Sequence, residues 1–354
     1  MKTGSGRKAE EKAADKIKQA QADAQADNKK KKGDANNRRD KKEENMEADQ
    51  MPKGDDNQET AKKEEKQRYA FFVGCTTALK IPFVERLARE LFSILDIELI
   101  DLDFSCCPTS RIVKDMDRDL WLVIAARNLA LAEKEKLPIL SMCTGCTQTL
   151  KEAAAELSSK ETRENINEML PEGLRYEGKS EIVFYSQCLY DNKGRIRQKV
   201  KKPLSLDIAT HPGCHILRPS SILGFDDPEN PTKMDEILKA CGAEPVDFKN
   251  KTLCCGFPIY DVDAEAAKDI MAEKLRGLRA DCMAVQCPTC FTYYELRQKA
   301  IAEEMGFAAL PVLHLIQLVA FAMGIDDVGC ELMHNKAPTV WEKLAREQQK
   351  KIFK

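Results

Sequence analysis

The chain has 354 residues and a formal net charge of −2 at pH 7, a balance that favours neither a nucleic acid nor an anionic membrane as its partner. Residues 1–67 contain no aromatic residue, leucine, valine or cysteine, so they cannot bury enough apolar surface to offset the entropy of ordering. We predict a disordered charged extension at 1–67. The alternative is a docking arm for a charged partner surface.

No segment of the sequence indicates export or membrane insertion. No apolar run near the first residues resembles a signal peptide, which predicts a cytoplasmic protein with reduced thiols. The most apolar stretch, 307–324, is interrupted by His314 and Gln317 and is short for a bilayer span. We therefore expect no membrane span, and disulfides are a poor explanation for the fourteen cysteines.

Short apolar or β-branched runs that end near cysteines predict strands. In chain order, the runs with their cysteines are RYAFFVGC (68–75), IELIDLDFSCC (97–107), LPILSMCTGC (137–146), SLDIATHPGC (205–214), the weaker EPVDFKNKTLCC (244–255) and DCMAVQCPTC (281–290). Between them, apolar positions in 83–95 and 117–136 recur at i, i+3 and i+4, which predicts helices.

Alternating strands and helices predict an α/β fold of two similar domains, each a mostly parallel sheet flanked by helices. We place the first domain at 68–203, the second at 204–335, and a C-terminal helix or tail at 336–354. In parallel sheets, ligands bind outside the carboxyl ends of the strands. The cysteines of each domain should therefore converge on one crevice.

The cysteine spacing is repeated. The first half reads C-x30-CC-x35-CxxC and the second reads C-x39-CC-x31-CxxC, which indicates a duplicated domain. The first set is Cys75, Cys106, Cys107, Cys143 and Cys146, and the second set is Cys214, Cys254, Cys255, Cys287 and Cys290.

Five thiols in each set favour iron–sulfur clusters. A structural zinc ion is satisfied by four tetrahedral ligands, so adjacent cysteine pairs in a set of five fit it badly. Iron–sulfur clusters are held by soft thiolates, and a CxxC before a helix places sulfurs near backbone N–H groups. Zinc in one site remains the alternative.

The other candidate residues have weaker signals. Cys188, Cys241, Cys282 and Cys330 fall outside the repeat, and we expect Cys188 and Cys282 to be buried as small apolar side chains. His211 and His215 flank Cys214, where a histidine could donate a proton or hydrogen-bond to a loop or a sulfur. We expect His314 to be in the core and His334 on the surface. Lys80 and Arg218 could pair with an anionic group of a substrate, although a solvated surface is the commoner place for both.

Several motifs resemble the CCG-domain family, and most closely the B subunits of heterodisulfide reductases. The matching segments, in order, are YAFFVGC, SCCP, the helix WLVIAARNLALAE, MCTGC, GCHILRPS, FDDPENPT, the second CCG and CPTCF. The likeness spans about residues 68–325. Related iron–sulfur subunits of glycolate, lactate and glycerol-phosphate dehydrogenases carry an N-terminal CxxCxxC module, which this sequence does not contain.

The resemblance implies that each five-cysteine set binds a non-cubane 4Fe–4S cluster and that a disulfide is cleaved between the two clusters. In methanogens this is the mixed disulfide of coenzymes M and B. His215 matches the family's histidine beside the second cluster. The implied partners are a protein like the reductase's C subunit, with cubane iron–sulfur clusters, and a flavin protein like its A subunit. The sequence departs from the family at Phe257 and Pro258, after the second CCG, which leaves the identity of the disulfide open.

Three functions therefore remain open at the level of sequence: a disulfide-reducing catalytic subunit, an electron-relay subunit without disulfide chemistry of its own, and a zinc-stabilised assembly subunit.

Overall fold

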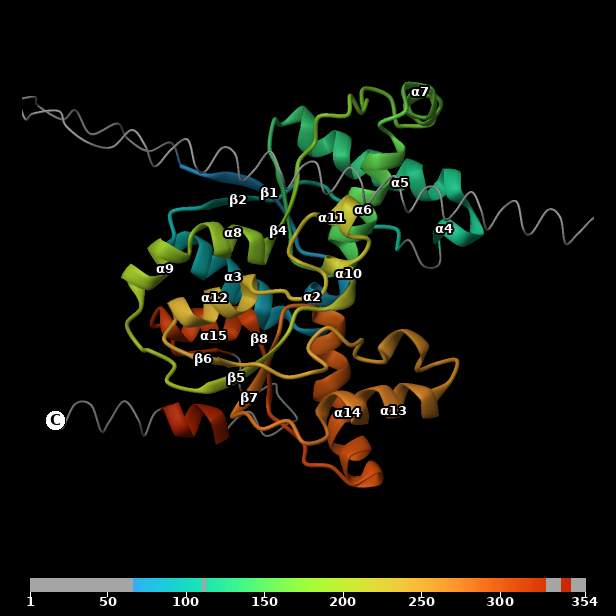
Figure 1. Ribbon diagram of the computed structural model, residues 1–354. Coiled ribbons are helices and arrows are strands. Elements are labelled where there is room, and N and C mark those ends of the chain that lie inside the picture. Colours follow the sequence, from blue (N-terminus) through green and yellow to red (C-terminus); the bar gives the residue numbers. More distant parts are fainter. Residues whose placement is uncertain (1–65, 110–112, 329–338, 345–354) are drawn as a thin grey trace, which may run out of the picture. The chain divides into compact units, whose positions relative to one another are not determined.

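A computed structural model describes residues 66–109, 113–328 and 339–344 (Figure 1). All but the last two residues of the predicted extension 1–67 lie outside the described residues, as do Cys330 and His334. Of the predicted C-terminal segment 336–354, only 339–344 is described, and it is helical.

The fold contains two four-stranded parallel sheets with the same strand order. The first sheet has the order β2-β1-β3-β4, and the second has β6-β5-β7-β8. The strands are β1 (Arg68–Phe72), β2 (Glu98–Ile100), β3 (Ile139–Ser141), β4 (Ile182–Phe184), β5 (Asp207–His211), β6 (Glu244–Val246), β7 (Cys282–Val285) and β8 (Val312–His314). The prediction of two similar α/β domains with parallel sheets is confirmed, and the weakly predicted strand before the second cysteine pair is present as β6.

Helices connect the strands and cover the sheets. In the first half they are α2 (Cys75–Lys80), α3 (Pro82–Ile94), α4 (Val113–Met116), α5 (Arg118–Lys134), α6 (Thr144–Glu156) and α7 (Lys160–Asn167). After β4 come α8 (Tyr185–Asp191) and α9 (Lys193–Lys199), and the second half contains α10 (Cys214–Leu217), α11 (Ser220–Leu223), α12 (Lys233–Ala240), the 3-10 turn η1 (Phe257–Ile259), α13 (Ala264–Leu275), α14 (Pro288–Met305) and α15 (Leu315–Ala322). The predicted helices at 83–95 and 117–136 correspond to α3 and α5.

The two halves exchange helices across a shared core. Helix α15, which follows the last strand of the second sheet, packs on α3 of the first half, and α8, which follows the last strand of the first sheet, packs on α12. These helices gather between the two sheets in Figure 1. The apolar face of α3, which includes Leu87 and Leu91 one helical turn apart, is buried in this shared core. The exchange ties the two cysteine-bearing halves into one unit.

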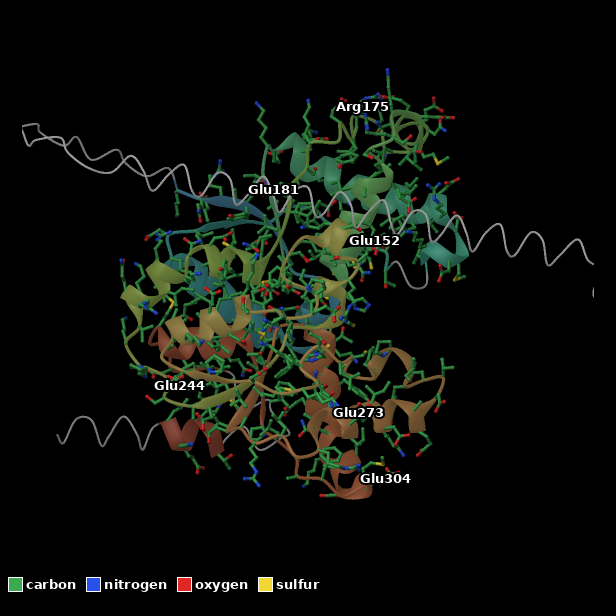
Figure 2. The ribbon with its side chains drawn as sticks, in the orientation of Figure 1. Glu152, Arg175, Glu181, Glu244, Glu273 and Glu304 are labelled. Carbon is green, nitrogen blue, oxygen red and sulfur yellow. The ribbon has the colours of Figure 1, made fainter. Side chains whose placement is uncertain are left out.

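Three glutamates mark the surface of the protein. Glu181, Glu244 and Glu304 are exposed (Figure 2). Strands β3 and β7, by contrast, are buried along their whole length. Within the part of the chain that the structure describes, we find no helix with the length and apolar character needed to span a membrane.

Candidate metal centre

The cysteines follow the carboxyl ends of the strands, as expected for ligands of a parallel sheet. Cys143 and Cys287 are the N-cap residues of α6 and α14, and Cys146 and Cys290 lie in the first turns of these helices. Each CxxC therefore sits at a helix N-terminus, where unpaired N–H groups and the helix dipole stabilise negative charge on sulfur.

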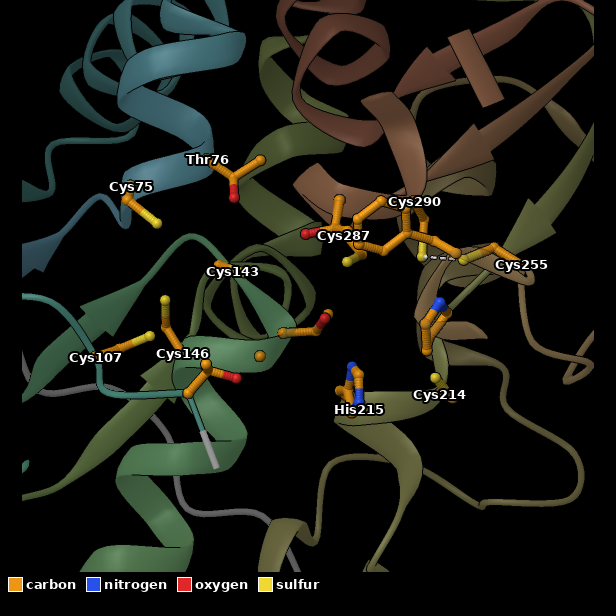
Figure 3. A pocket seen from close by; sticks show the side chains of 16 residues that line it. Cys75, Thr76, Cys107, Cys143, Cys146, Cys214, His215, Cys255, Cys287 and Cys290 are labelled. Atoms are coloured by element: carbon orange, nitrogen blue, oxygen red, sulfur yellow. Dashed lines mark hydrogen bonds between the residues drawn. The ribbon is translucent and has the colours of Figure 1, made fainter. Parts of the chain in front are cut away.

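One cavity of about 270 Å³ brings both cysteine sets together (Figure 3). Its lining includes eight of the ten predicted ligands: Cys75, Cys107, Cys143, Cys146, Cys214, Cys255, Cys287 and Cys290. Cys106 lines a neighbouring pocket of about 350 Å³ together with Cys75 and Cys107. The tenth predicted ligand, Cys254 of the second set, is half-buried.

Hydrogen bonds link four thiols of the first set, those of Cys106, Cys107, Cys143 and Cys146. Cys107 accepts hydrogen bonds from Cys106 and then Cys146, and these lower the pKa of Cys107 to about 4. The same contact with Cys107, together with burial, raises the pKa of Cys106. Cys75 and Cys106 are both exposed, and their charges interact. Crowded thiols that share protons in this way favour a thiolate, which is the form that binds metal.

The thiols of the second set are also linked by hydrogen bonds that shift their pKa values in opposite directions. Hydrogen bonds from Cys214 and then Cys255 lower the pKa of Cys254 to about 2, and the contact with Cys254 raises the pKa of Cys255 to about 12. The Sγ atoms of Cys255 and Cys290 lie 3.5 Å apart. Cys290 also contacts Cys287.

The two sets meet through Cys143 and Cys287. A hydrogen bond from Cys143, followed by one from Cys290, lowers the pKa of Cys287 well below its usual value. The pKa of Cys143 is raised, because the opposing effect of Cys146 is outweighed by Cys287 and by burial. Sulfur contacts therefore run from one half of the chain into the other.

The donors of the cavity suit a sulfur-loving metal group. The lining contains cysteine, threonine, glycine, histidine, phenylalanine and proline, and none of the side chains is a carboxylate. Soft thiolates select iron–sulfur clusters, zinc or copper(I), whereas calcium and magnesium need oxygen ligands. Eight thiols in one lining fit iron–sulfur clusters better than one tetrahedral ion.

Two histidines lie at the second set. His215 is half-buried and lines the cavity (Figure 3). His211 is fully buried, and burial lowers its pKa to about 3. Its side chain lies within 4.8 Å of Cys255 and Cys290, measured between their ligand atoms, and its ring nitrogens have no hydrogen-bond partner among the described residues. His211 is therefore a candidate for a metal ligand or a hydrogen-bond donor to a cluster sulfur.

The structure places Lys80 and Arg218 away from the lining. Lys80 lines a separate pocket of about 210 Å³ with Phe83 and Phe291. The guanidinium of Arg218 donates to the Glu229 carboxylate at 3.1 Å and is about half exposed. A role for either residue in substrate binding stays a prediction.

The sequence reasoning missed four threonines that line the cavity. Thr144 and Thr289 are inner residues of the two CxxC motifs, and Thr76 directly follows Cys75. Thr109 completes the group. A polar residue inside each CxxC was the available signal.

Cysteines outside the repeat are core residues where the structure describes them. Cys188 and Cys282 are buried, as predicted, and Cys241 is buried too. Burial raises the pKa of Cys188 to about 11 and that of Cys241 to about 12. His314 is buried too, stacked on Tyr185.

Fold and site together define a duplicated cysteine-rich protein whose two halves present their thiols to one cavity. The model of the cysteine-rich CCG domain matches residues 69–151 and 208–293. A hypothetical protein from Helicobacter pylori has a similar structure, with a TM-score of 0.60 at 18% identity over 77% of this chain and 52% of its own, which shows the fold alone.

Curated relatives specify the family. The chain is 32% identical to the B subunit of the ferredoxin:CoB-CoM heterodisulfide reductase of Methanosarcina mazei over 277 residues, covering 75% of this chain and 92% of the relative. A protein of Archaeoglobus profundus that is named as similar to the heterodisulfide reductase B subunit is 34% identical, with coverages of 73% and 91%. The 8-methylmenaquinol:fumarate reductase membrane anchor subunit of Wolinella succinogenes is 36% identical, with coverages of 76% and 96%. This chain belongs to the CCG-domain family of heterodisulfide reductase B subunits and related iron–sulfur reductase subunits.

Proposed function

We propose that this chain is the catalytic iron–sulfur subunit of a heterodisulfide reductase-type complex, in which a disulfide is reduced between two non-cubane 4Fe–4S clusters. The observation that supports it most directly is the convergence of eight of the ten cysteines, four from each set, on one cavity. In this proposal the first set holds one cluster and the second set holds the other. A protein like the reductase's C subunit, with cubane clusters, and a flavin protein like its A subunit would deliver the electrons.

The reaction needs two electrons and two protons. The S–S bond breaks, each sulfur gains one electron and one proton, and two thiols leave. When bound, the clusters supply single electrons and iron atoms that can bind a thiolate sulfur. In this proposal His215, which lines the cavity at the second set, donates a proton to one leaving thiolate, and the other thiolate takes its proton from solvent.

The cavity lining bears on the choice of substrate. Phe257 and Pro258 lie in it beside Cys255 and His215, so a bulky ring and a rigid ring occupy the place after the second CCG. The side chain of Phe257 is 39% exposed, so it is free to contact a substrate that enters. We propose that these two residues shape the pocket for a disulfide that differs from CoM-S-S-CoB in the groups attached to its two sulfur atoms.

A second candidate is an electron-relay subunit without disulfide chemistry. It is favoured by the 36% identity to the Wolinella succinogenes protein, which is named as part of a menaquinol:fumarate reductase. A relay needs the same cysteine sets but no open position for a thiol.

The test is metal analysis and disulfide turnover of the anaerobically purified complex. We expect iron and sulfide in the wild-type protein, an EPR signal that changes when thiol is added, and consumption of at least one member of a disulfide panel. Iron and sulfide without any thiol effect or turnover would select the relay, and zinc without sulfide would select the zinc-stabilised assembly subunit.

A matched pair of variants tests the ligands. Cys255→Ala removes a thiol in contact with Cys254 and Cys290, so we expect loss of one cluster's iron and of disulfide turnover. Cys188→Ala also removes a buried thiol, but one in the apolar core, and should keep its iron. Full iron and full turnover in Cys255→Ala would contradict the ligand assignment.

A further inference from the structure

A buried lysine holds the loop that carries the second cysteine pair. Lys274 lies on α13 and is 2% exposed. Its Nζ atom donates to the carbonyl oxygens of Asn250 at 2.7 Å, Lys251 at 2.9 Å and Leu253 at 2.9 Å. An ammonium group has three donors, so all of them are used by the segment that leads directly into Cys254.

The charge of Lys274 has no carboxylate partner among the described residues. The neighbouring Lys251, by contrast, is paired with Asp235. A buried ammonium group is costly unless negative charge lies nearby. Burial lowers the pKa of Lys274 to about 7, and Cys290 and the other thiols of the second set oppose this shift. The natural counter-charge of Lys274 is therefore the second cysteine set.

In the first half, a neutral buried residue holds the loop of the cysteine pair. Helix α5 precedes β3 as α13 precedes β7, and its Asn128 is completely buried. Asn128 accepts from the backbone N–H of Ser105 at 2.9 Å and donates to the carbonyl oxygen of Cys106 at 3.0 Å. The charged Arg127 of the same helix also donates to the Asp103 carbonyl oxygen at 2.8 Å, but its charge is paired with the Asp103 carboxylate at 2.9 Å. Both helices thus hold the loop of a cysteine pair from a corresponding position. Among the described residues, only the second half has a buried positive charge without a carboxylate partner at this place.

We propose that Lys274 is a positioning residue that holds the loop bearing Cys254 and Cys255, and that its charge makes the second centre the more easily reduced of the two. The three carbonyl acceptors of Lys274 need the three N–H donors of its ammonium form. Reduction adds negative charge, and a positive charge held in a poorly solvated interior favours the reduced state. Asn128 offers the first centre no such charge. The electrostatic part rests on the proposed iron–sulfur function, whereas the loop-holding part does not.

The experiment compares three variants of the full chain in its complex. Lys274→Met removes the charge but keeps a long apolar stem, and Lys274→Arg keeps the charge. The matched control is Lys268→Met on the same helix, because Lys268 pairs with Glu265 and Glu304 at the surface. Two readouts are used: a spectroelectrochemical titration of the reduction steps, and amide hydrogen exchange over residues 250–256.

In Lys274→Met we expect one reduction step to move to lower potential while the other stays, and exchange over 250–256 to become about tenfold faster or more. Lys268→Met should change neither, and Lys274→Arg should keep the potential near that of the wild type. Loss of the second cluster from Lys274→Met with retention in Lys274→Arg also supports the proposal.

Three results would overturn it. Unchanged reduction steps in Lys274→Met, or an equal shift or equal iron loss in Lys274→Arg, would remove the electrostatic role. Unchanged hydrogen exchange would remove the positioning role. A wild-type complex without iron and sulfide would refute the proposed function instead, and the exchange measurement would still decide whether Lys274 holds the loop.

Discussion

The glycine of the second CCG is the position where a single methyl group should be most harmful. Gly256 has φ +95°, and a Cβ atom placed on it would lie 2.6 Å from the carbonyl oxygen of Ala267 in α13. Gly277, just beyond the other end of α13, has φ +78° and no heavy atom within 4 Å of such a Cβ. Gly256→Ala and Gly277→Ala therefore share the backbone strain and differ in the steric clash.

The magnitude follows from these two terms. A left-handed backbone costs an L-residue about 1–2 kcal/mol, and both variants incur this cost. Overpacking adds about 1–3 kcal/mol in Gly256→Ala, because the obstacle is a helix backbone that cannot rotate away as a side chain would. We expect Gly256→Ala to lower the free energy of unfolding by about 1–3 kcal/mol more than Gly277→Ala.

Urea unfolding followed by far-UV circular dichroism measures this difference, and iron analysis adds a second readout. The backbone N–H of Gly256 donates to the Sγ atom of Cys254 at 3.4 Å, so a displaced Gly256 should also weaken the second centre. Gly277→Ala should keep the iron content of the wild type. Coincident unfolding midpoints for the two variants would refute the steric reasoning.

Three further predictions concern the core, the pH dependence and the pocket. Trp121→Phe removes the buried hydrogen bond from Nε1 to Thr149 Oγ1 (2.9 Å), and thermal unfolding should show a loss of stability of about 1–3 kcal/mol. The control is Leu120→Ala at the half-exposed neighbouring residue, which should cost less than about 0.5 kcal/mol. Burial lowers the pKa of His314 to about 3, so between pH 6.5 and 3 this histidine binds a proton in the unfolded state but not in the folded state. The free energy of unfolding therefore decreases as the pH is lowered through this range, by up to about 1.4 kcal/mol per pH unit. His314→Asn should flatten this dependence, and an unchanged slope would contradict the assignment. Phe257→Ala should keep the iron content but change the relative KM values across the disulfide panel; identical values would show that the ring does not contact the substrate.

The parts of the fold that depend on local patterns were predictable from the sequence. Apolar runs before the cysteines became strands, and the periodic stretches became α3 and α5, because alternation and 3.6-residue periodicity are properties of short segments. The position of each CxxC at a helix N-terminus follows for the same reason, since Cys143 and Cys287 stand between a strand and a helical pattern.

Other features depend on contacts that local patterns do not report. Cys143 and Cys287 lie 144 positions apart in the sequence and meet because α8 and α15 cross into the opposite half. In the sequence, Lys274 is one of several charged residues in its segment, and its neighbours give no signal that its side chain is buried and donates to three carbonyl groups. Lys80 ends the short helix α2, which carries its side chain to a separate pocket.

The meeting of the two CxxC motifs also constrains how independent the two centres can be. The N-termini of α6 and α14 face the same cavity, so the positive ends of two helix dipoles act on both cysteine sets at once. The hydrogen bond between Cys143 and Cys287 joins the sets directly. Negative charge gained in one half is therefore felt in the other through a short, buried path with low dielectric screening. Because the halves share this field, the field alone does not distinguish them, whereas the exchange of a neutral Asn128 for a charged Lys274 does.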